Sequence, residues 1–189
     1  LFPLQAQAIQ SADAFHLVQN SADRSVLSQL DSNQIATIIA YLPLSTYRFI
    51  TAPSPYLLLQ DTNRKRLILV NPNERSEPIL LNAEVKEWAW SSDEQTLLFT
   101  DGFDIEVYSP QSHTRKTITR FSQPIYGLHW YPEGTVAVFE TQGTIFAQEL
   151  DRRGSINKTT LMNGLSGSEF WFEEKGKWLV GLTQDNGKT

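Results

Sequence analysis

Short apolar runs separated by polar turns recur along the whole sequence. In residues 85–99, a run with alternating apolar and polar positions ends at Trp90, a Ser-Ser-Asp-Glu turn follows, and a second apolar run reaches Phe99. The next copy, residues 125–139, has the same order. Such short runs bounded by turn residues are typical of β-strands, and no segment shows a sustained helical period with caps. The pattern therefore predicts an all-β protein.

The pattern is also an internal repeat. Aromatic residues at the end of the first strand mark four copies at spacings of 41, 40 and 42 residues, and these residues are Phe49, Trp90, Trp130 and Phe172. A fifth copy is indicated near the start, where residues 16–20 match residues 57–61 at an offset of 41. The repeat divides the chain into units with approximate boundaries 1–43, 44–84, 85–124, 125–166 and a partial 167–189.

Each unit is expected to contain four short strands. In the unit 85–124, the turns between the strands are Ser-Ser-Asp-Glu, Asp-Gly and Ser-Pro-Gln-Ser, all suited to reversing a chain. A small sheet with large residues on its faces cannot bury them alone, whereas radial stacking of several sheets does bury them.

Four-stranded repeats of roughly 40 residues are typical of a β-propeller. The predicted fold is therefore an all-β propeller of four-stranded antiparallel blades. We interpret residues 1–189 as a single incomplete propeller domain with about four and a half blades, and we expect it to be part of a larger ring.

Composition narrows the classes of partner. The chain is 40% hydrophobic and 20% charged, which is typical of globular proteins. Its net charge of −5 does not favour nucleic acid, because a phosphate-binding surface needs concentrated Lys and Arg. The longest apolar stretch, residues 35–44, is too short for a membrane-spanning helix, so no membrane insertion by this segment is expected. The absence of cysteine excludes disulfides and thiolate metal sites.

No catalytic, metal-binding or cofactor-binding pattern is recognised. The three histidines occupy different positions in the repeat and lack zinc-site spacing. Asp101, Asp104 and Glu106 lack the Asp-x-Asp-x-Asp-Gly pattern of a calcium loop, so the first of them is interpreted as part of a hairpin turn. Residues 164–168 partly resemble a Gly-x-Ser-x-Gly turn but lack its final glycine and a following helix. We therefore expect no catalytic residue, metal or cofactor in this chain.

Side chains in the first strands of the units are the candidates for a ligand-binding rim. They are Tyr47, Trp88, Tyr126, His129 and Trp171. Tyr and Trp are favoured at interfaces, so those that reach the face or the channel of a ring could contact a ligand. The alternative is that the aromatic residues pack between blades and that His129 is structural or exposed to solvent.

One run of the sequence resembles a known repeat family. Residues 90–99, Trp-Ser-Ser-Asp-Glu-Gln-Thr-Leu-Leu-Phe, resemble the core of the TolB-type, WD-like repeat, with Ser92 in place of that family's proline and Glu94 in place of its glycine. Residues 47–61 look like the propeller region of bacterial PEGA-domain proteins, although no PEGA module is visible. This resemblance implies a bacterial, envelope-associated binding or scaffold role and supplies no catalytic residues.

The predicted function is a non-catalytic binding or scaffold propeller of a larger bacterial envelope protein, presenting blade loops to a protein, peptide or glycan. We expect it to be extracytoplasmic and tethered by a membrane anchor outside this segment. Two alternatives remain open at this stage. One is an accessory, gating propeller of a prolyl-oligopeptidase-like hydrolase whose catalytic domain lies elsewhere. The other is a ring that catalyses a reaction in its channel.

Overall fold

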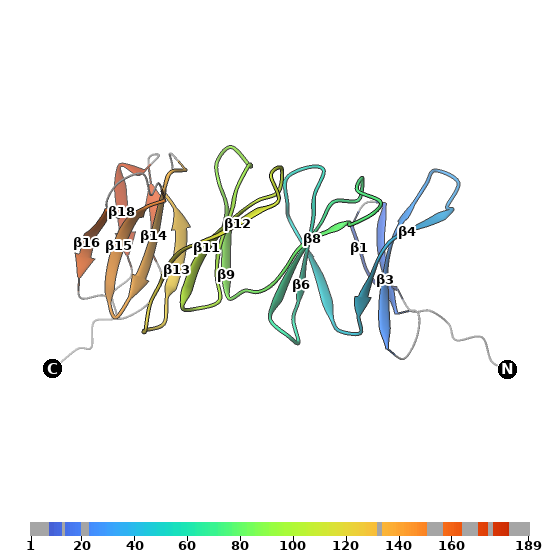
Figure 1. Ribbon diagram of the computed structural model, residues 1–189, viewed down its shortest axis with the longest axis horizontal. Helices are drawn as coiled ribbons and strands as arrows, with labels where there is room; N and C mark the ends of the chain where they lie inside the picture. The colour runs from blue at the N-terminus through green and yellow to red at the C-terminus, as the bar shows by residue number, and fades with distance from the viewer. Residues whose placement is uncertain are drawn as a thin grey trace. The chain divides into compact units, whose positions relative to one another are not determined.

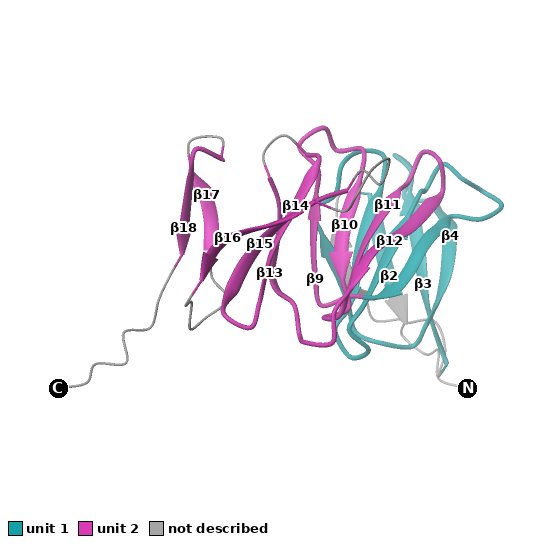
Figure 2. Cartoon of the chain, turned by 60° about the vertical axis from the view of Figure 1, so that its left-hand side comes forward, with its two compact units in different colours: residues 1–84 teal, residues 85–189 magenta. Residues whose placement is uncertain are grey.

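The computed structural model describes residues 8–12, 14–19, 23–131, 134–150, 157–163, 170–173 and 176–181. These residues form eighteen β-strands, many of which are labelled in Figure 1. The chain divides into two compact units, residues 1–84 (unit 1) and residues 85–189 (unit 2), which Figure 2 distinguishes by colour. The boundary coincides with the predicted boundary between the second and third repeats. That residues 1–189 form one propeller domain stays a prediction.

Unit 1 contains two four-stranded antiparallel sheets. Sheet 1 is built from β1 (Ala8–Ala12), β2 (Phe15–Gln19), β3 (Arg24–Leu30) and β4 (Ala36–Pro43). Sheet 2 is built from β5 (Tyr47–Ile50), β6 (Leu57–Asp61), β7 (Arg66–Val70) and β8 (Ile79–Glu84). In both sheets the strands pair in chain order, as expected for strands joined by tight turns.

Unit 2 contains two further four-stranded antiparallel sheets and a hairpin. Sheet 3 consists of β9 (Glu87–Trp90), β10 (Leu97–Thr100), β11 (Asp104–Ser109) and β12 (Thr114–Arg120). Sheet 4 consists of β13 (Tyr126–Trp130), β14 (Val136–Thr141), β15 (Thr144–Glu149) and β16 (Lys158–Asn163). Sheet 5 pairs β17 (Phe170–Glu173) with β18 (Trp178–Gly181).

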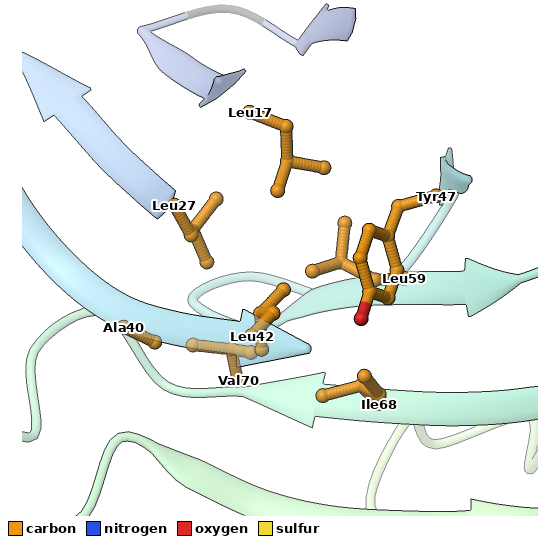
Figure 3. Close-up of a cluster of buried hydrophobic side chains, with 8 residues drawn as sticks. All are labelled: Leu17, Leu27, Ala40, Leu42, Tyr47, Leu59, Ile68 and Val70. Atoms are coloured by element: carbon orange, nitrogen blue, oxygen red, sulfur yellow. The ribbon is translucent and has the colours of Figure 1, made fainter. Parts of the chain in front are cut away.

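The core of each unit lies between neighbouring sheets. In unit 1, Leu27 and Leu42 of sheet 1 pack with Leu59 of sheet 2, and Figure 3 shows side chains from both sheets pointing toward one another. In unit 2, Leu98 of sheet 3 lies in one cluster with Phe139 of sheet 4. The second strand of a sheet is buried on both faces, which explains why Leu97–Thr100 is apolar at nearly every position. Burial of each large apolar side chain contributes about 1.5–3 kcal/mol.

Hydrogen bonds also join neighbouring sheets at the period of the repeat. The indole Nε1 of Trp130 donates to the carbonyl oxygen of Ala89 at 3.0 Å, and the amide of Leu128 donates to Glu87 Oε2 at 2.7 Å. Both pairs are 41 residues apart. Trp130 therefore anchors sheet 4 to sheet 3 through both its ring and its N–H group.

Each outer strand carries one extra residue. In all four four-stranded sheets, the register between the third and fourth strands shifts by one position, so that one residue of the fourth strand has no partner. These β-bulges fall at Ile39, Leu80, Ile118 and Leu161, which are 41, 38 and 43 residues apart. A bulge bends an edge strand and increases its twist. The repeat is thus a repeat of strand geometry as well as of sequence.

Candidate functional site

Two of the five predicted rim residues occupy a core position of the repeat. In four of the repeats an aromatic residue marks the end of the first strand, and we call it the anchor. Tyr47 and Trp88 lie two residues before the anchor of their repeat, as do Leu128 and Phe170. Tyr47 is only 1% exposed, and both Leu128 and Phe170 are 3% exposed, whereas Trp88 is half-buried opposite Phe99. Because side chains alternate along a strand, this position faces a neighbouring sheet at Tyr47, Leu128 and Phe170, which all belong to core clusters.

Tyr47 is held inside unit 1 by a polar contact as well as by packing. Its hydroxyl donates a hydrogen bond to the carbonyl oxygen of Pro43 at 2.6 Å. Burial, reinforced by the nearby Asp61 carboxylate, raises the pKa of Tyr47 to about 12. The phenol is therefore neutral at ordinary pH and its ring belongs to the core (Figure 3), which leaves it no surface to offer a ligand.

Trp171 is exposed and belongs to sheet 5. It is 39% exposed on β17, and its indole N–H donates to Oε1 of Glu173 at 3.2 Å on the same strand. Its sequence neighbour Phe170 points the other way, into a cluster with Val138 and Ile145.

Tyr126 and His129 meet charged partners from the preceding sheet. The Lys86 ammonium lies 3.9 Å from the centroid of the Tyr126 ring and 3.4 Å from the carbonyl oxygen of Ile125. One carboxylate oxygen of Glu87 accepts the Leu128 amide, and the charge of Glu87 acts on His129. We call Lys86, Glu87, Tyr126 and His129 the first-strand cluster. It lies within unit 2, at the start of sheets 3 and 4.

A β-bulge in β13 sets the positions of Tyr126 and His129. Tyr126 pairs with Glu140 and His129 pairs with Val138, so two residues of β13 oppose one residue of β14. Gly127 within this bulge has φ of 57°, a left-handed conformation that glycine adopts without steric cost. Bulges re-aim side chains, and here the bulge leaves the Tyr126 ring 37% exposed beside Lys86.

The His129 imidazole is half-buried against sheet 5. Its ring lies 4.9 Å from the Phe170 ring in an edge-on arrangement. Burial lowers the pKa of His129 below its ordinary value, and the Glu87 carboxylate partly opposes this shift. The imidazole is therefore neutral at pH 7, and a hydrogen bond to the Phe170 backbone engages one of its nitrogens.

Acidification is expected to destabilise unit 2 through His129. Because its folded pKa is lowered, the unfolded chain takes up the proton first, so this stability is present above the unfolded pKa and is lost as pH falls through it. Urea unfolding between about pH 7 and about pH 5 should show a steeper loss for the wild type than for His129→Gln. His113→Gln, at an exposed histidine of the same unit, is the control and should follow the wild type. Parallel curves for all three proteins would contradict this prediction.

The sequence prediction missed Lys86 and Glu87. Both lie about one repeat before the segment they contact, Lys86 40 residues before Tyr126 and Glu87 41 residues before Leu128. The repeat spacing itself was the available signal, since residues one period apart on first strands become neighbours when sheets stack. The chemistry of the cluster is thus shared between two units of the repeat, and a search within a single unit overlooks it.

The acidic residues considered as a calcium site have separate partners. Asp101 Oδ1 accepts the amides of Phe103 and Asp104, both at 2.8 Å, as in a tight turn. The Arg115 guanidinium makes two hydrogen bonds to Glu106, at 2.7 and 2.8 Å. Among the residues that the structure describes, no group of three or more His, Asp or Glu side chains is arranged to hold a metal ion. Residues 164–168, considered as a nucleophile turn, lie outside the described residues.

Across the described parts of the chain, no helix has the length and apolar character needed to cross a membrane.

Comparison of the sequence with known protein families and with curated proteins finds no match. Comparison of the structure with solved structures finds several propellers. The C-terminal WD40 domain of Sif2 is 17% identical with a TM-score of 0.53, over 89% of this chain and 51% of that one. An oligogalacturonate lyase in complex with manganese is 12% identical with a TM-score of 0.52, over 92% and 56%. The periplasmic gluconolactonase PpgL of Pseudomonas aeruginosa is 10% identical with a TM-score of 0.50, over 88% and 59%.

These comparisons overturn the expectation that the protein is not an enzyme. Two of the three similar structures are enzymes by name, a lyase and a lactonase. The expectation rested on the absence of contiguous catalytic motifs in the sequence. A fold that presents side chains from several strands and loops can assemble catalytic groups without such a motif. The absence of motifs therefore does not exclude catalysis in this chain.

The chain spans between 51% and 59% of the length of these three structures. At such low identity, they show the fold alone. The predicted all-β fold is confirmed: the four-stranded antiparallel sheets are the blades of a β-propeller.

Proposed function

We propose that this chain is the ligand-binding propeller of a larger bacterial, envelope-associated protein, and that the first-strand cluster contacts a protein, peptide or glycan ligand. One observation carries the proposal: an exposed aromatic ring and a neutral imidazole on β13 lie near a carboxylate at the start of β9 and a cation just before it, all in one compact unit. The part of the Tyr126 ring that Lys86 leaves exposed suits the apolar side of such a ligand, while the polar groups suit its hydrogen-bonding groups.

The rigidity of the framework supports binding rather than a purely structural role for these residues. Strands position side chains more accurately than loops do, and β9 and β13 are tied together by the hydrogen bonds of Glu87 and Trp130. The envelope location rests on the resemblance of residues 47–61 to PEGA-domain proteins. The periplasmic location of PpgL, which shares the fold, is compatible with it.

Tyr126→Ala is expected to weaken ligand binding about tenfold or more, as loss of a central aromatic contact commonly does. The full chain would be screened against an oligosaccharide array and a library of extended peptides, and each hit titrated with wild type and variant. Trp178→Ala is the matched control, because Trp178 is another exposed aromatic residue of unit 2, 55% exposed on β18. Its affinity should equal that of the wild type.

Equal affinity of Tyr126→Ala and wild type for every hit would sink the assignment of the site. Circular dichroism must show both variants folded, and Lys86→Gln provides a second test that leaves all aromatic packing in place. Because enzymes share this fold, each hit would also be assayed for turnover. Turnover that depends on His129 or Glu87 would make the same cluster a catalytic site.

A further inference from the structure

A small polar groove lies in unit 2 beside the turn that joins β14 and β15. Its volume is about 230 Å³. Hydroxyl, amide and aromatic side chains line it together with one lysine, and they include Phe121, Gln123, Thr141, Gln142, Phe146 and Lys158. Among the described residues, no Asp or Glu lines this groove. The groove therefore offers hydrogen-bond donors and one positive charge, without a fixed negative charge.

Lys158 is held over two aromatic rings. Its ammonium lies 4.4 Å from the centroid of the Phe146 ring and 5.3 Å from that of Phe121. The cations of the neighbouring outer strand β12 are arranged differently, since Arg115 pairs with Glu106 and Arg120 lies 3.5 Å from Asp104. Within the described residues, Lys158 has no carboxylate partner of this kind. Its charge is thus positioned by the rings and available to an anion.

Thr141 supplies a second, independent observation. It ends β14, is only 6% exposed, and lines the groove. Its hydroxyl has no hydrogen-bond partner among the described residues. The adjacent Glu140 carboxylate is already used by the turn, where it accepts the Gly143 amide at 2.6 Å. Buried hydroxyls are normally hydrogen-bonded, and this one is itself shielded from solvent, so it meets an external acceptor only when the Thr141 side chain rotates about χ1 toward the groove.

We infer that this groove binds the carboxylate group of a peptide, either at its C-terminus or in an acidic side chain. Lys158 supplies the counter-charge, and Thr141 and the amides of Gln123 and Gln142 supply donors. A peptide fits better than a sugar because Lys158 covers the ring faces on which a sugar would stack. The glutamine amides match the donors and acceptors of a peptide backbone. The inference does not depend on the first-strand cluster.

The test is a calorimetric and NMR titration of the full chain with defined probes. The first is an acetylated, amidated tripeptide with a central glutamate, the second is its glutamine isostere, and the third has a free C-terminal carboxylate and no acidic side chain. Galacturonic acid is the sugar probe. We expect a carboxylate peptide to bind at least tenfold more tightly than the glutamine isostere and to shift the side-chain amide signals of Gln123 and Gln142. The first and third probes show which carboxylate is preferred.

Two variants separate binding from folding. Lys158→Gln should weaken the peptide at least tenfold, whereas Lys116→Gln, at an exposed lysine of β12, should leave affinity within twofold of wild type. Thr141→Val has nearly the same shape and removes only the hydroxyl. Because that hydroxyl has no partner in the fold, the melting temperature should stay unchanged or rise while affinity falls severalfold.

Three results would overturn the inference. They are wild-type affinity in Lys158→Gln, a lower melting temperature in Thr141→Val, and binding of galacturonic acid as tight as that of the peptides. The amide signals of Gln123 and Gln142 report on this groove and not on the first-strand cluster, so failure here is distinguishable from failure of that cluster.

Discussion

Phe139→Ala is expected to lower the free energy of unfolding of unit 2 by about 3–5 kcal/mol, the usual cost of deleting a buried aromatic side chain. Phe139 is fully buried in the cluster between sheets 3 and 4. Its ring lies 5.1 Å from the Phe121 ring and 6.0 Å from the Phe146 ring. Removing it leaves a cavity and also deprives two other rings of their packing partner.

Chemical denaturation followed by tryptophan fluorescence measures this loss, because Trp88 and Trp130 lie in the same two sheets. Phe103→Ala is the matched control, since Phe103 belongs to unit 2 but is 44% exposed. The control should lose less than about 1 kcal/mol, as expected for a surface substitution. Similar losses in the two variants would show that Phe139 does not hold the sheets together.

Asp61→Ala is expected to cost unit 1 about 2–3 kcal/mol, because several donors lose a buried, charged acceptor together. Asp61 ends β6 and is 1% exposed. Its Oδ1 accepts the Ser45 hydroxyl at 2.5 Å and the amides of Asn63 and Arg64 at 3.1 and 2.9 Å. The carboxylate therefore holds the β6–β7 turn and Ser45, two residues before β5, in one arrangement.

Thermal and urea unfolding of Asp31→Ala give the comparison. Asp31 also caps a turn of unit 1, accepting the amides of Asn33 and Ile35 at 2.8 Å each, but it is exposed. Water can replace it, so its loss should stay near 1 kcal/mol or below. Equal destabilisation by the two substitutions would mean that burial of Asp61 does not contribute to its role.

The four-stranded sheets could be predicted because their determinants are local. Asp101 illustrates this, since an Asp-Gly pair predicts a reversal and the carboxylate indeed accepts the two amides that follow it. The spacing of the aromatic anchors then aligned the first strands correctly, and Trp130 does bridge to the sheet one period before it. Signals of this kind need only the residue and its near neighbours.

The candidate site was less predictable because exposure depends on what stacks against a strand. Tyr47 and Trp88 were proposed as rim residues, yet Leu128 and Phe170 occupy the same repeat position and are buried. An apolar residue at the equivalent position of another repeat was therefore the sign that this position is buried. By contrast, the position just before the anchor holds Arg48, Ala89, His129 and Trp171, and this variety marks a place that the core does not constrain.

The bulges were missed for a different reason. Pairing between a third and a fourth strand brings together residues that turns of variable length separate, so one unpaired residue leaves no mark in the local pattern. Ile39 and Ile118 look like ordinary strand residues in the sequence. Each lacks a pairing partner in the adjacent third strand, and its side chain packs with the core of its compact unit.

The extra residue at Ile39, Leu80, Ile118 and Leu161 has a consequence for how such a chain can change. The fourth strand of every four-stranded sheet contains the same bulge, so each repeat contains all the residues that pair its third and fourth strands. Duplication or exchange of a whole repeat by recombination preserves this pairing, provided that the crossover falls between repeats. The first strands are then free to diverge, and in this chain they hold the residues of the first-strand cluster.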